Sequence, residues 1–444
     1  MVWVLVVGRT EVKHYLLPED IEPDRNGNKI SNIFQNRKYL ADIILFLIYV
    51  EIMPAIVEFL FWASVFLILY TYAGYPLLVW TLTRIRGFFH KKPGLRDPGS
   101  LSVTVIVTAY NEEAVLEQKI RNCFGLNYPA ASLHFLFVAD GSYDRSVEII
   151  KKYPGIRLLH GPVRLGKAAA MNRAMAVADT PLVVFSDANT FLNRDALNRI
   201  VRHYADPEVG AVAGEKRVMP EPGRPVSSGE GLYWQYESRL KKLDSDWNTT
   251  VGAAGELFSI RTALYSPLPE DTILDDFVQS LQVCIKGYRV RYEPEAYAEE
   301  SASPSIREEM ERKVRISAGG FQAMGRLLPL FNPFRYPLVC FQFLSHRIFR
   351  WTVCPLALVV AFISALILAC RGIALFQAMA AAQLVFYMAA AAGWRQALRN
   401  RRSRWFYLPF YFTFMHLCVF AGFRRFLLGK QPAMWQRAGR QADK

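Results

Sequence analysis

The sequence predicts an α/β domain, built on a parallel, doubly wound sheet, that is inserted between membrane-spanning helices. Three features of the chain carry this prediction. Uncharged apolar runs long enough to cross a bilayer lie toward both ends of the chain. About 270 residues of ordinary soluble composition separate them. Within that middle part, short β-branched runs alternate with segments of helical spacing, which is typical of parallel sheets.

Composition narrows the class of protein before any motif is considered. The 444 residues allow two to four domains, and 52% of them are hydrophobic, which excludes a disordered or collagen-like chain. A net charge of +14 leaves a nucleic-acid binder or a membrane protein facing acidic lipid. The six cysteines form no CxxC pair, so neither a disulfide scaffold nor a structural zinc is expected.

Four apolar runs favour the membrane reading and argue against nucleic acid as a partner. Each is at least 19 residues long, whereas core helices rarely remain uncharged over such a length. The runs are 59–83, 352–370, 373–394 and 405–423. A shorter run at 43–52 is an extra span, an interfacial helix or part of a longer first helix.

Basic residues beside the runs predict the orientation. They follow the first run at 84–92 and fill the loop at 395–404, so both places should be cytoplasmic. The tail 424–444 is also basic, yet counting spans places it outside. Either the last run does not cross fully, or the charge rule fails there.

These boundaries divide the chain into six parts. We expect residues 1–52 to be an over-extended start that is dispensable, because they show neither a periodic apolar face nor a site residue. The other parts are a membrane helix at 53–83, a cytoplasmic domain at 84–325, interfacial helices at 326–351, about three membrane helices at 352–423 and a basic tail at 424–444.

The middle domain reads as five strands with helices between them. Apolar, β-branched runs indicate strands that are buried on both faces. The expected strands are 103–108, 133–139, 156–160, 182–186 and 209–214, and the expected helices are 111–124, 144–152 and 166–177.

Polar residues follow three of these strands, at the edge where ligands of such sheets bind. Glu112 follows the first strand, Asp140 the second and Asp187 the fourth. Asp187 ends an apolar strand, where a carboxylate needs a partner. A hard cation is one such partner; capping of the next helix is the alternative.

Three further groups allow two readings each. Lys167 lies at the start of a helix, where it is either a ligand for a phosphate group or an ordinary surface lysine. Asp275 and Asp276 begin another helix. They either cap that helix, where its dipole favours acidic residues, or supply a general base. Arg312 and Arg315 point the same way from a helix, and suit either a diphosphate or lipid headgroups.

Taken in order, these stretches resemble the membrane-embedded, processive-type glycosyltransferases of family 2. That group includes cellulose, hyaluronan and poly-N-acetylglucosamine synthases. The resemblance covers about 250 residues and continues into the C-terminal apolar runs. The matching stretches are VTVIVTAYNEE, FVADGSYDRS, GKAAAMNRA, VVFSDANT, GEGLYWQYE, VGAAGELFSIR, ILDDFVQSL, GYRVRYEPEA, RKVRISAGGFQ and LSHRIFRW.

The resemblance implies a GT-A fold and an inverting hexosyltransferase. The expected reaction moves a sugar from a nucleotide-sugar, a UDP-sugar, to a growing polysaccharide that is exported. The alternatives are transfer to a lipid-linked saccharide or glycolipid, and a non-catalytic assembly subunit. The implied place is the plasma (inner) membrane with a cytoplasmic catalytic domain, the implied cofactor is Mg²⁺ or Mn²⁺, and other exopolysaccharide assembly proteins are possible partners.

The resemblance also implies roles for individual residues. Asp276 matches the catalytic base, and Asp275, one residue earlier, is expected to point elsewhere. Asp187 matches the first acid of the DxD metal motif, while the second position is Asn189, which offers a carbonyl oxygen but no charge. The nucleotide-sugar pocket is expected to contain Ala109, Tyr110, Glu112, Asp140, Lys167 and Asp187.

The acceptor end departs from the family pattern. Of the QxxRW motif only Arg315 is kept, because Arg312 replaces the glutamine and Ile316 the tryptophan. The family's tryptophan lies at the acceptor end, so this replacement bears on long-chain polymerisation. The expected acceptor and diphosphate residues are Trp234, Gly255, Glu256, Asp275, Arg312 and Arg315.

Overall fold

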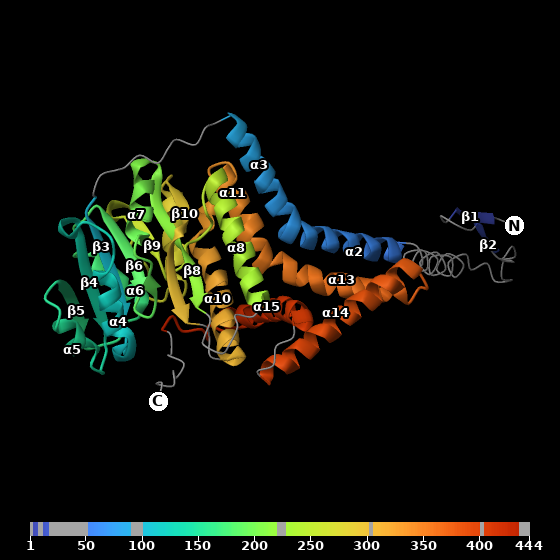
Figure 1. Cartoon of the computed structure of the whole chain (residues 1–444). Helices are drawn as coiled ribbons and strands as arrows, with labels where there is room; N and C mark the ends of the chain where they lie inside the picture. Colours follow the sequence, from blue (N-terminus) through green and yellow to red (C-terminus); the bar gives the residue numbers. More distant parts are fainter. Residues whose placement is uncertain are drawn as a thin grey trace, which may run out of the picture. The chain divides into compact units, whose positions relative to one another are not determined.

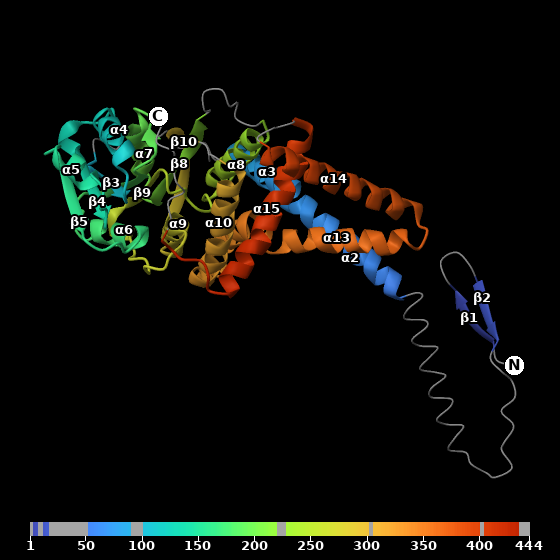
Figure 2. The ribbon, with the colours of Figure 1, turned by 90° about the horizontal axis from the view of Figure 1, so that it is seen from below.

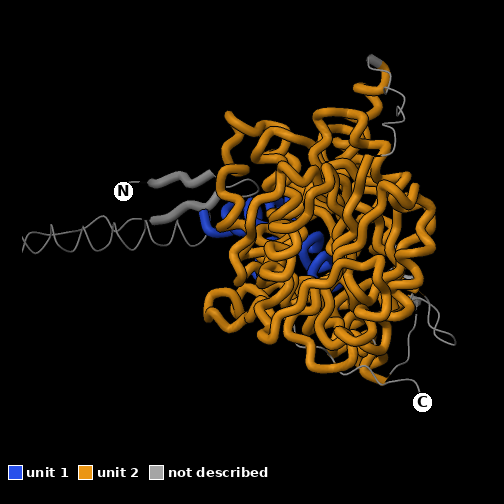
Figure 3. The backbone as a smooth tube through the Cα atoms, turned by 90° about the vertical axis from the view of Figure 1, so that its left-hand side faces the viewer, with its two compact units in different colours: residues 1–67, 357–384 blue, residues 68–356, 385–444 orange. Residues whose placement is uncertain are grey.

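The computed structural model describes residues 3–7, 12–16, 52–89, 101–219, 228–301, 305–399 and 404–434. The chain divides into two compact units, residues 1–67 with 357–384 and residues 68–356 with 385–444 (Figure 3). Strands β1 (Trp3–Val7) and β2 (Val12–Leu16) form an antiparallel hairpin where the sequence showed no clear period. The apolar run at 43–52 lies outside the described residues except for its last position.

The second unit is built on one mixed sheet of eight strands (Figure 1). Their spatial order is β5-β4-β3-β6-β9-β8-β10-β7. The strands are β3 (Val103–Ala109), β4 (Leu133–Asp140), β5 (Ile156–Gly161), β6 (Leu182–Asp187), β7 (Phe191–Leu192), β8 (Val209–Met219), β9 (Phe258–Arg261) and β10 (Arg289–Ser301).

The prediction of a parallel sheet is right for β5, β4, β3 and β6 and for the pair of β8 with β10, and it is wrong for the short strands β9 and β7. Strands β5, β4, β3 and β6 are parallel neighbours, as the alternating pattern indicated. Strand β9 runs antiparallel to both β6 and β8, and β7 runs antiparallel to β10. With four and two residues, β9 and β7 are too short to leave a hydrophobic pattern that predicts them.

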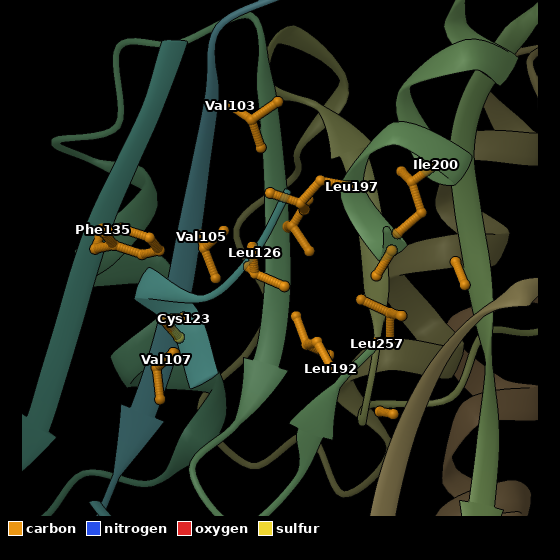
Figure 4. Close-up of a cluster of buried hydrophobic side chains, with 14 of the residues drawn as sticks. Val103, Val105, Val107, Cys123, Leu126, Phe135, Leu192, Leu197, Ile200 and Leu257 are labelled. Carbon is orange, nitrogen blue, oxygen red and sulfur yellow. The ribbon is translucent and has the colours of Figure 1, made fainter. Parts of the chain in front are cut away.

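Helices cover both faces of the sheet, so its central strands are buried on both sides. Val105 and Val107 of β3 belong to one apolar cluster, with Cys123 and Leu197 from helices on that face (Figure 4). Ile106, between them in the chain, belongs to a second cluster on the other face. The helices of this domain are α4 (Glu113–Phe124), α5 (Ser146–Lys151), α6 (Lys167–Met175), α7 (Ala196–Val201), α8 (Ser228–Trp247), α9 (Asp275–Ile285) and α10 (Ile306–Arg326).

The apolar runs form long helices. Helix α2 (Met53–Leu69) continues through a π-helical turn, η2 (Tyr70–Gly74), into α3 (Tyr75–Phe89). Within the described residues, three helices are long and apolar enough to cross a membrane, or four if a bent pair counts as one span. The remaining elements are α11 (Pro337–Phe343), η7 (Leu344–Ile348), α12 (Phe349–Trp351), α13 (Val353–Ala369), α14 (Ala374–Leu398) and α15 (Arg404–Leu427).

A buried polar network fastens α3 to α8 and to the segment 344–351. The Tyr75 hydroxyl donates to Asp244 Oδ1 at 2.6 Å, and His346 Nδ1 lies 2.5 Å from Asp244 Oδ2. His346 Nε2 lies 3.2 Å from Glu237, which also accepts from Arg350 at 2.7 Å. Both ring nitrogens of His346 therefore face carboxylates of α8. The α3 end of the first long helix is therefore held by charged groups of the sheet domain.

Candidate active site

Asp140, at the end of β4, holds the turn that starts α6. Its carboxylate accepts hydrogen bonds from the backbone N–H of Leu165 at 3.1 Å and of Gly166 at 2.7 Å. It also pairs with Arg173 Nη2 at 2.5 Å. Gly166 has φ +97°, a conformation that favours glycine. Asp140 therefore sets the position from which Lys167, the first residue of α6, reaches the sheet edge.

An aromatic platform lies at the end of β3. The Arg164 guanidinium lies 3.7 Å from the centre of the Tyr110 ring, and the exposed Tyr143 ring meets Tyr110 edge-on at 6.2 Å. Asn111, which adopts φ +52°, fixes this corner because its Oδ1 accepts from the Tyr143 N–H at 3.0 Å. Planar rings of this kind suit a nucleobase. Sequence reasoning placed Tyr110 at this strand end but missed the contributions of Tyr143 and Arg164.

Four charged residues from three elements meet beside this platform, and we call them the strand-end cluster: Lys167, Asp187, Asp275 and Asp276. Lys167 Nζ lies 2.7 Å from Asp187 Oδ1 and 3.5 Å from Asp275 Oδ2. The expectation that Asp275 points elsewhere is therefore wrong, because both acids at the start of α9 face this cluster. Burial opposes the charged form of Lys167, but the three carboxylates outweigh it and raise the pKa of its ammonium.

Gly255 lies against this cluster, and its lack of a side chain leaves room for the charged groups. A Cβ at this position would lie 2.9 Å from Lys167 Nζ and 3.5 Å from Asp276 Oδ2. Burial, together with the charge of Asp275, raises the pKa of Asp276 to about 7, although Lys167 opposes the shift. A carboxyl that titrates near neutrality combines availability with basicity, as a general base requires.

A second set of charges lies next to the strand-end cluster, and we call it the ion-pair network: Lys216, Glu256, Glu300 and Arg312. Lys216 pairs closely with both glutamates. Arg312 Nη2 lies 3.2 Å from Glu256 and 3.5 Å from Glu300. Burial alone would raise the pKa of Glu256, but Lys216 and Arg312 hold it well below its usual range. The side chain of Arg312 is thus paired within the protein.

The ion-pair network is joined to the predicted metal motif. Asn189 Nδ2 donates to Glu300 Oε1 at 3.1 Å, so only its carbonyl oxygen remains as a ligand for a cation. Sequence reasoning missed Lys216 and Glu300. Their signal was the presence of several charged residues in each of two long strands, β8 and β10, a pattern that does not reveal which of them pair.

Lys119, on α4, lies directly beneath the loop that carries Asp187. This fully buried lysine donates to Ser186 Oγ and to the Thr190 carbonyl, both at 2.7 Å. Burial lowers the pKa of its ammonium, and the charge of Asp187 partly opposes the shift. Sequence reasoning missed this residue because it reads as one more polar position on an amphipathic helix.

Two predicted acceptor residues occupy different surroundings. Arg315 donates to the carbonyl oxygens of Ile273 and Ala433, each at 3.2 Å, and burial lowers the pKa of its guanidinium. The Trp234 ring lies 5.3 Å from the Lys313 ammonium, a cation–π contact. The structure therefore brings Arg315 to the turn before Asp275 and places Trp234 against α10.

The strand-end cluster offers oxygen ligands to a hard cation. Asp187 keeps 29% of its side-chain surface exposed, and the buried Asp275 Oδ2 makes no hydrogen bond, its nearest charged neighbour being Lys167 Nζ at 3.5 Å. Among the described residues, no three His, Cys, Asp or Glu side chains are arranged as a complete metal site. The residues therefore fit a divalent metal that takes its remaining ligands from a bound diphosphate.

Comparison with known proteins defines the class. Residues 104–266 match the family model described as glycosyl transferase family 2. This match covers the strands and loops that carry Asp140, Lys167 and Asp187, so the middle of the chain is a family 2 glycosyltransferase domain. The family resemblance and the enzyme class predicted from the sequence, a hexosyltransferase, are confirmed.

Individual relatives agree with this class. The chain is 26% identical over 298 residues to a poly-β-1,6-N-acetyl-D-glucosamine synthase of Staphylococcus aureus (strain COL), covering 64% of this chain and 71% of that protein. It is 26% identical over 233 residues to a β-monoglucosyldiacylglycerol synthase of Synechocystis sp., covering 50% and 48%.

A solved structure confirms the GT-A-type fold. It is the mannosyltransferase PcManGT from Pyrobaculum calidifontis, in complex with GDP-Man and Mn²⁺. The similarity has a TM-score of 0.61 at 24% identity and covers 84% of this chain and 99% of that one. The agreement extends beyond the 104–266 segment and includes most of the chain.

Proposed function

We propose that this protein transfers a hexosyl group from a nucleotide-sugar to a growing polysaccharide, with inversion at the anomeric carbon, and that Asp276 is the general base. The observation that carries the proposal is the position of Asp276. It is a half-buried carboxyl with a pKa near 7, beside Lys167 at the sheet edge where ligands of such folds bind. The family 2 match supports glycosyl transfer as the reaction.

In this proposal the nucleotide-sugar donor binds at the edge of the sheet. The Tyr110 platform stacks the base, which we take to be uracil, and Ala109, Glu112 and Asp140 shape its pocket. Asp187, with the Asn189 carbonyl, would hold Mg²⁺ or Mn²⁺. That metal would neutralise the donor diphosphate. The complex of PcManGT with GDP-Man and Mn²⁺ supports a nucleotide-sugar donor and a divalent metal.

In the reaction itself, the acceptor hydroxyl attacks the anomeric carbon while Asp276 takes its proton. The new glycosidic C–O bond forms as the bond to the diphosphate oxygen breaks, and the electron pair leaves with the diphosphate. Lys167 supplies positive charge at that point, and the positions of Gly255 and Arg315 suit contact with the reacting groups. No covalent intermediate is needed.

The acceptor is the part of the proposal with two candidates. The S. aureus relative is named for a polysaccharide, which supports a polymer acceptor near Trp234 and Glu256. A lipid-linked saccharide or glycolipid is the second candidate. Ile316 stands where the family's acceptor-end tryptophan is expected, and the Synechocystis relative is named for a glycolipid. We also propose the plasma (inner) membrane, which the apolar helices support, with the catalytic domain in the cytoplasm, which the basic residues beside those helices support.

A donor and acceptor screen tests the proposal. Purified full-length protein would be given a panel of UDP- and GDP-sugars, and the released nucleoside diphosphate would be measured. We expect release with at least one UDP-sugar, stimulated by a saccharide acceptor. Stimulation by a glycolipid alone would select the second candidate, and absence of release with every donor and acceptor would contradict transferase activity.

A further inference from the structure

Helix α15 is apolar enough to cross a membrane, yet it packs along a charged helix of the catalytic domain. A Cβ at Gly422 would lie 2.5 Å from Ser317 Cβ and 2.8 Å from the Val314 carbonyl, so the backbones of α15 and α10 nearly touch. Farther along, the rings of Phe423 and Phe321 are 4.8 Å apart. The two helices lie side by side (Figure 2).

The first half of α15 also rests on the catalytic domain. One face of it forms an apolar cluster with Val314 of α10 and Tyr233 of α8. The Tyr411 ring lies 5.7 Å from Tyr233, and His416 Nε2 lies 2.9 Å from the Tyr72 hydroxyl in the turn η2. The α15 members of the cluster are Tyr407, Phe410, Tyr411, Phe414 and Cys418. Contacts with α8 and α10 therefore extend over most of α15, and His416 adds a contact with the turn η2 of the first long helix.

Its partner α10 does not belong in hydrocarbon. The 21 residues of α10 include eight charged ones, among them Arg312 of the ion-pair network and Arg315 beside the strand-end cluster. Arginine, lysine and acidic residues are strongly disfavoured at the centre of a bilayer. A helix that follows α10 side by side is therefore held at the level of the catalytic domain.

The chain after α15 returns to the candidate active site. Gly429 has φ +62°, and the Lys430 N–H donates to the Arg425 carbonyl, a turn that ends the helix and reverses the chain. Four residues later, the Ala433 carbonyl accepts from Arg315 at 3.2 Å. Met434 follows, 3.5 Å from where a Cβ of Gly166 would lie. The end of α15 thus emerges on the side of the catalytic domain.

The other face of α15 is exposed and apolar. Its large exposed residues are Trp405, Phe406, Leu408, Leu417, Phe420 and Leu427. Phe423 and Phe426 border this face, because they are partly exposed and also contact Phe321 of α10. Exposed basic residues, Arg424, Arg425 and Lys430, follow at its C-terminal end. An apolar face with adjacent cations complements the boundary between acyl chains and anionic headgroups.

We propose that α15 does not cross the membrane. It lies in the headgroup layer on the catalytic side, with one face on α10 and α8 and the other in lipid. The tail beyond Gly429 therefore stays on the catalytic side. This placement puts all three basic segments of the chain, at 84–92, 395–404 and 424–440, on one side of the membrane, which the charge rule requires.

Protease protection of the full-length protein in sealed membrane vesicles tests the side of the tail. One variant carries an epitope after Lys444, and a control variant carries it at Gly372, in the turn between α13 and α14. We expect the C-terminal epitope to be cleaved or protected together with the catalytic domain. The Gly372 epitope should behave in the opposite way. A C-terminal epitope on the side opposite to the catalytic domain would overturn the proposal.

A matched pair of lysine substitutions tests the depth of α15. Leu417→Lys changes an exposed position in the middle of α15, and Val385→Lys changes one in the middle of α14. A lysine at the centre of a crossing helix should reduce the membrane-inserted yield by about tenfold or more. We expect this loss for Val385→Lys and a change below about twofold for Leu417→Lys. Equal losses would mean that α15 crosses.

The same variants separate lipid from a second copy of the chain as the occupant of the exposed face. If that face were a dimer contact, Leu417→Lys would convert a dimer into a monomer in mild detergent. We expect the mass of the detergent-solubilised protein to be unchanged by Leu417→Lys. A dimer that this substitution dissociates would overturn the lipid assignment. None of these readouts depends on which sugar or acceptor the enzyme uses.

Discussion

The strand-end cluster and the ion-pair network adjoin each other but are built differently. Lys167, Asp187, Asp275 and Asp276 come from the ends of elements and share one lysine among three acids. In the ion-pair network, two cations balance Glu256 and Glu300, and every charge has a partner. An acid in excess shifts its pKa and is available for chemistry, whereas a balanced network stabilises the fold. The following predictions test this contrast.

The largest effect should come from metal removal. Excess chelator should abolish turnover, because Asp187 would hold the cation that neutralises the donor diphosphate. Magnesium or manganese should restore the rate. Nucleoside diphosphate release is the measurement, and release that continues unchanged in chelator would contradict a metal role for the strand-end cluster.

Asp276→Asn should lower turnover by at least about 100-fold, because the amide keeps the shape of the side chain but does not accept the proton. Donor affinity should survive, since Lys167 and Asp187 remain. Asp275→Asn, one residue earlier, is the matched comparison: it removes a charge of the same cluster, beside Lys167, but leaves the proton acceptor in place, so its loss should be smaller. Turnover is normalised to folded protein, and equal, mild losses in the two variants would remove Asp276 from the mechanism.

Lys119→Met should raise the metal concentration needed for half-maximal activity by about tenfold. The substitution removes the ammonium that ties Ser186 to the Thr190 carbonyl, on either side of Asp187. Lys119→Arg keeps the charge and is the control. A lower melting temperature with an unchanged metal requirement would show that Lys119 serves the fold alone.

The dependence of turnover on pH should show the ionisation of Asp276, an acid of the strand-end cluster with a raised pKa. Asp276 acts in its ionised form, so turnover should fall as the pH drops below about 7, by about tenfold per pH unit. The charge of Asp275 helps to raise that pKa, so Asp275→Asn should shift the acidic limb to lower pH. An acidic limb that does not move would mean that another group controls it.

Arg312→Gln, which restores the family's residue, should have the smallest effect on turnover, within about threefold. It leaves Glu256 and Glu300 with Lys216 as their cation, so the cost should appear in stability, at about 1–3 kcal/mol. Thermal unfolding measured beside turnover tests this. A large loss of turnover without loss of stability would place Arg312 in the reaction and remove the contrast between the two sets.

The sequence by itself determined the parts that depend on local pattern. The strands β3, β4 and β6 were predicted because a strand buried on both faces needs a continuous apolar run, and the polar residue that ends such a run is visible in the chain. That reasoning located Asp140 and Asp187, and the order of the motifs gave the enzyme class. The apolar runs predicted long helices in the same way.

Only the tertiary structure decided what depends on pairing across distance. The direction of β9, the contact of Asp275 with Lys167 and the pairing of Glu300 with Lys216 each join residues far apart in the chain. The same is true of α15, whose composition suits a membrane span but whose partner is the charged helix α10. An apolar composition shows that a helix is compatible with a lipid environment, whereas the surface against which the helix packs determines where it lies.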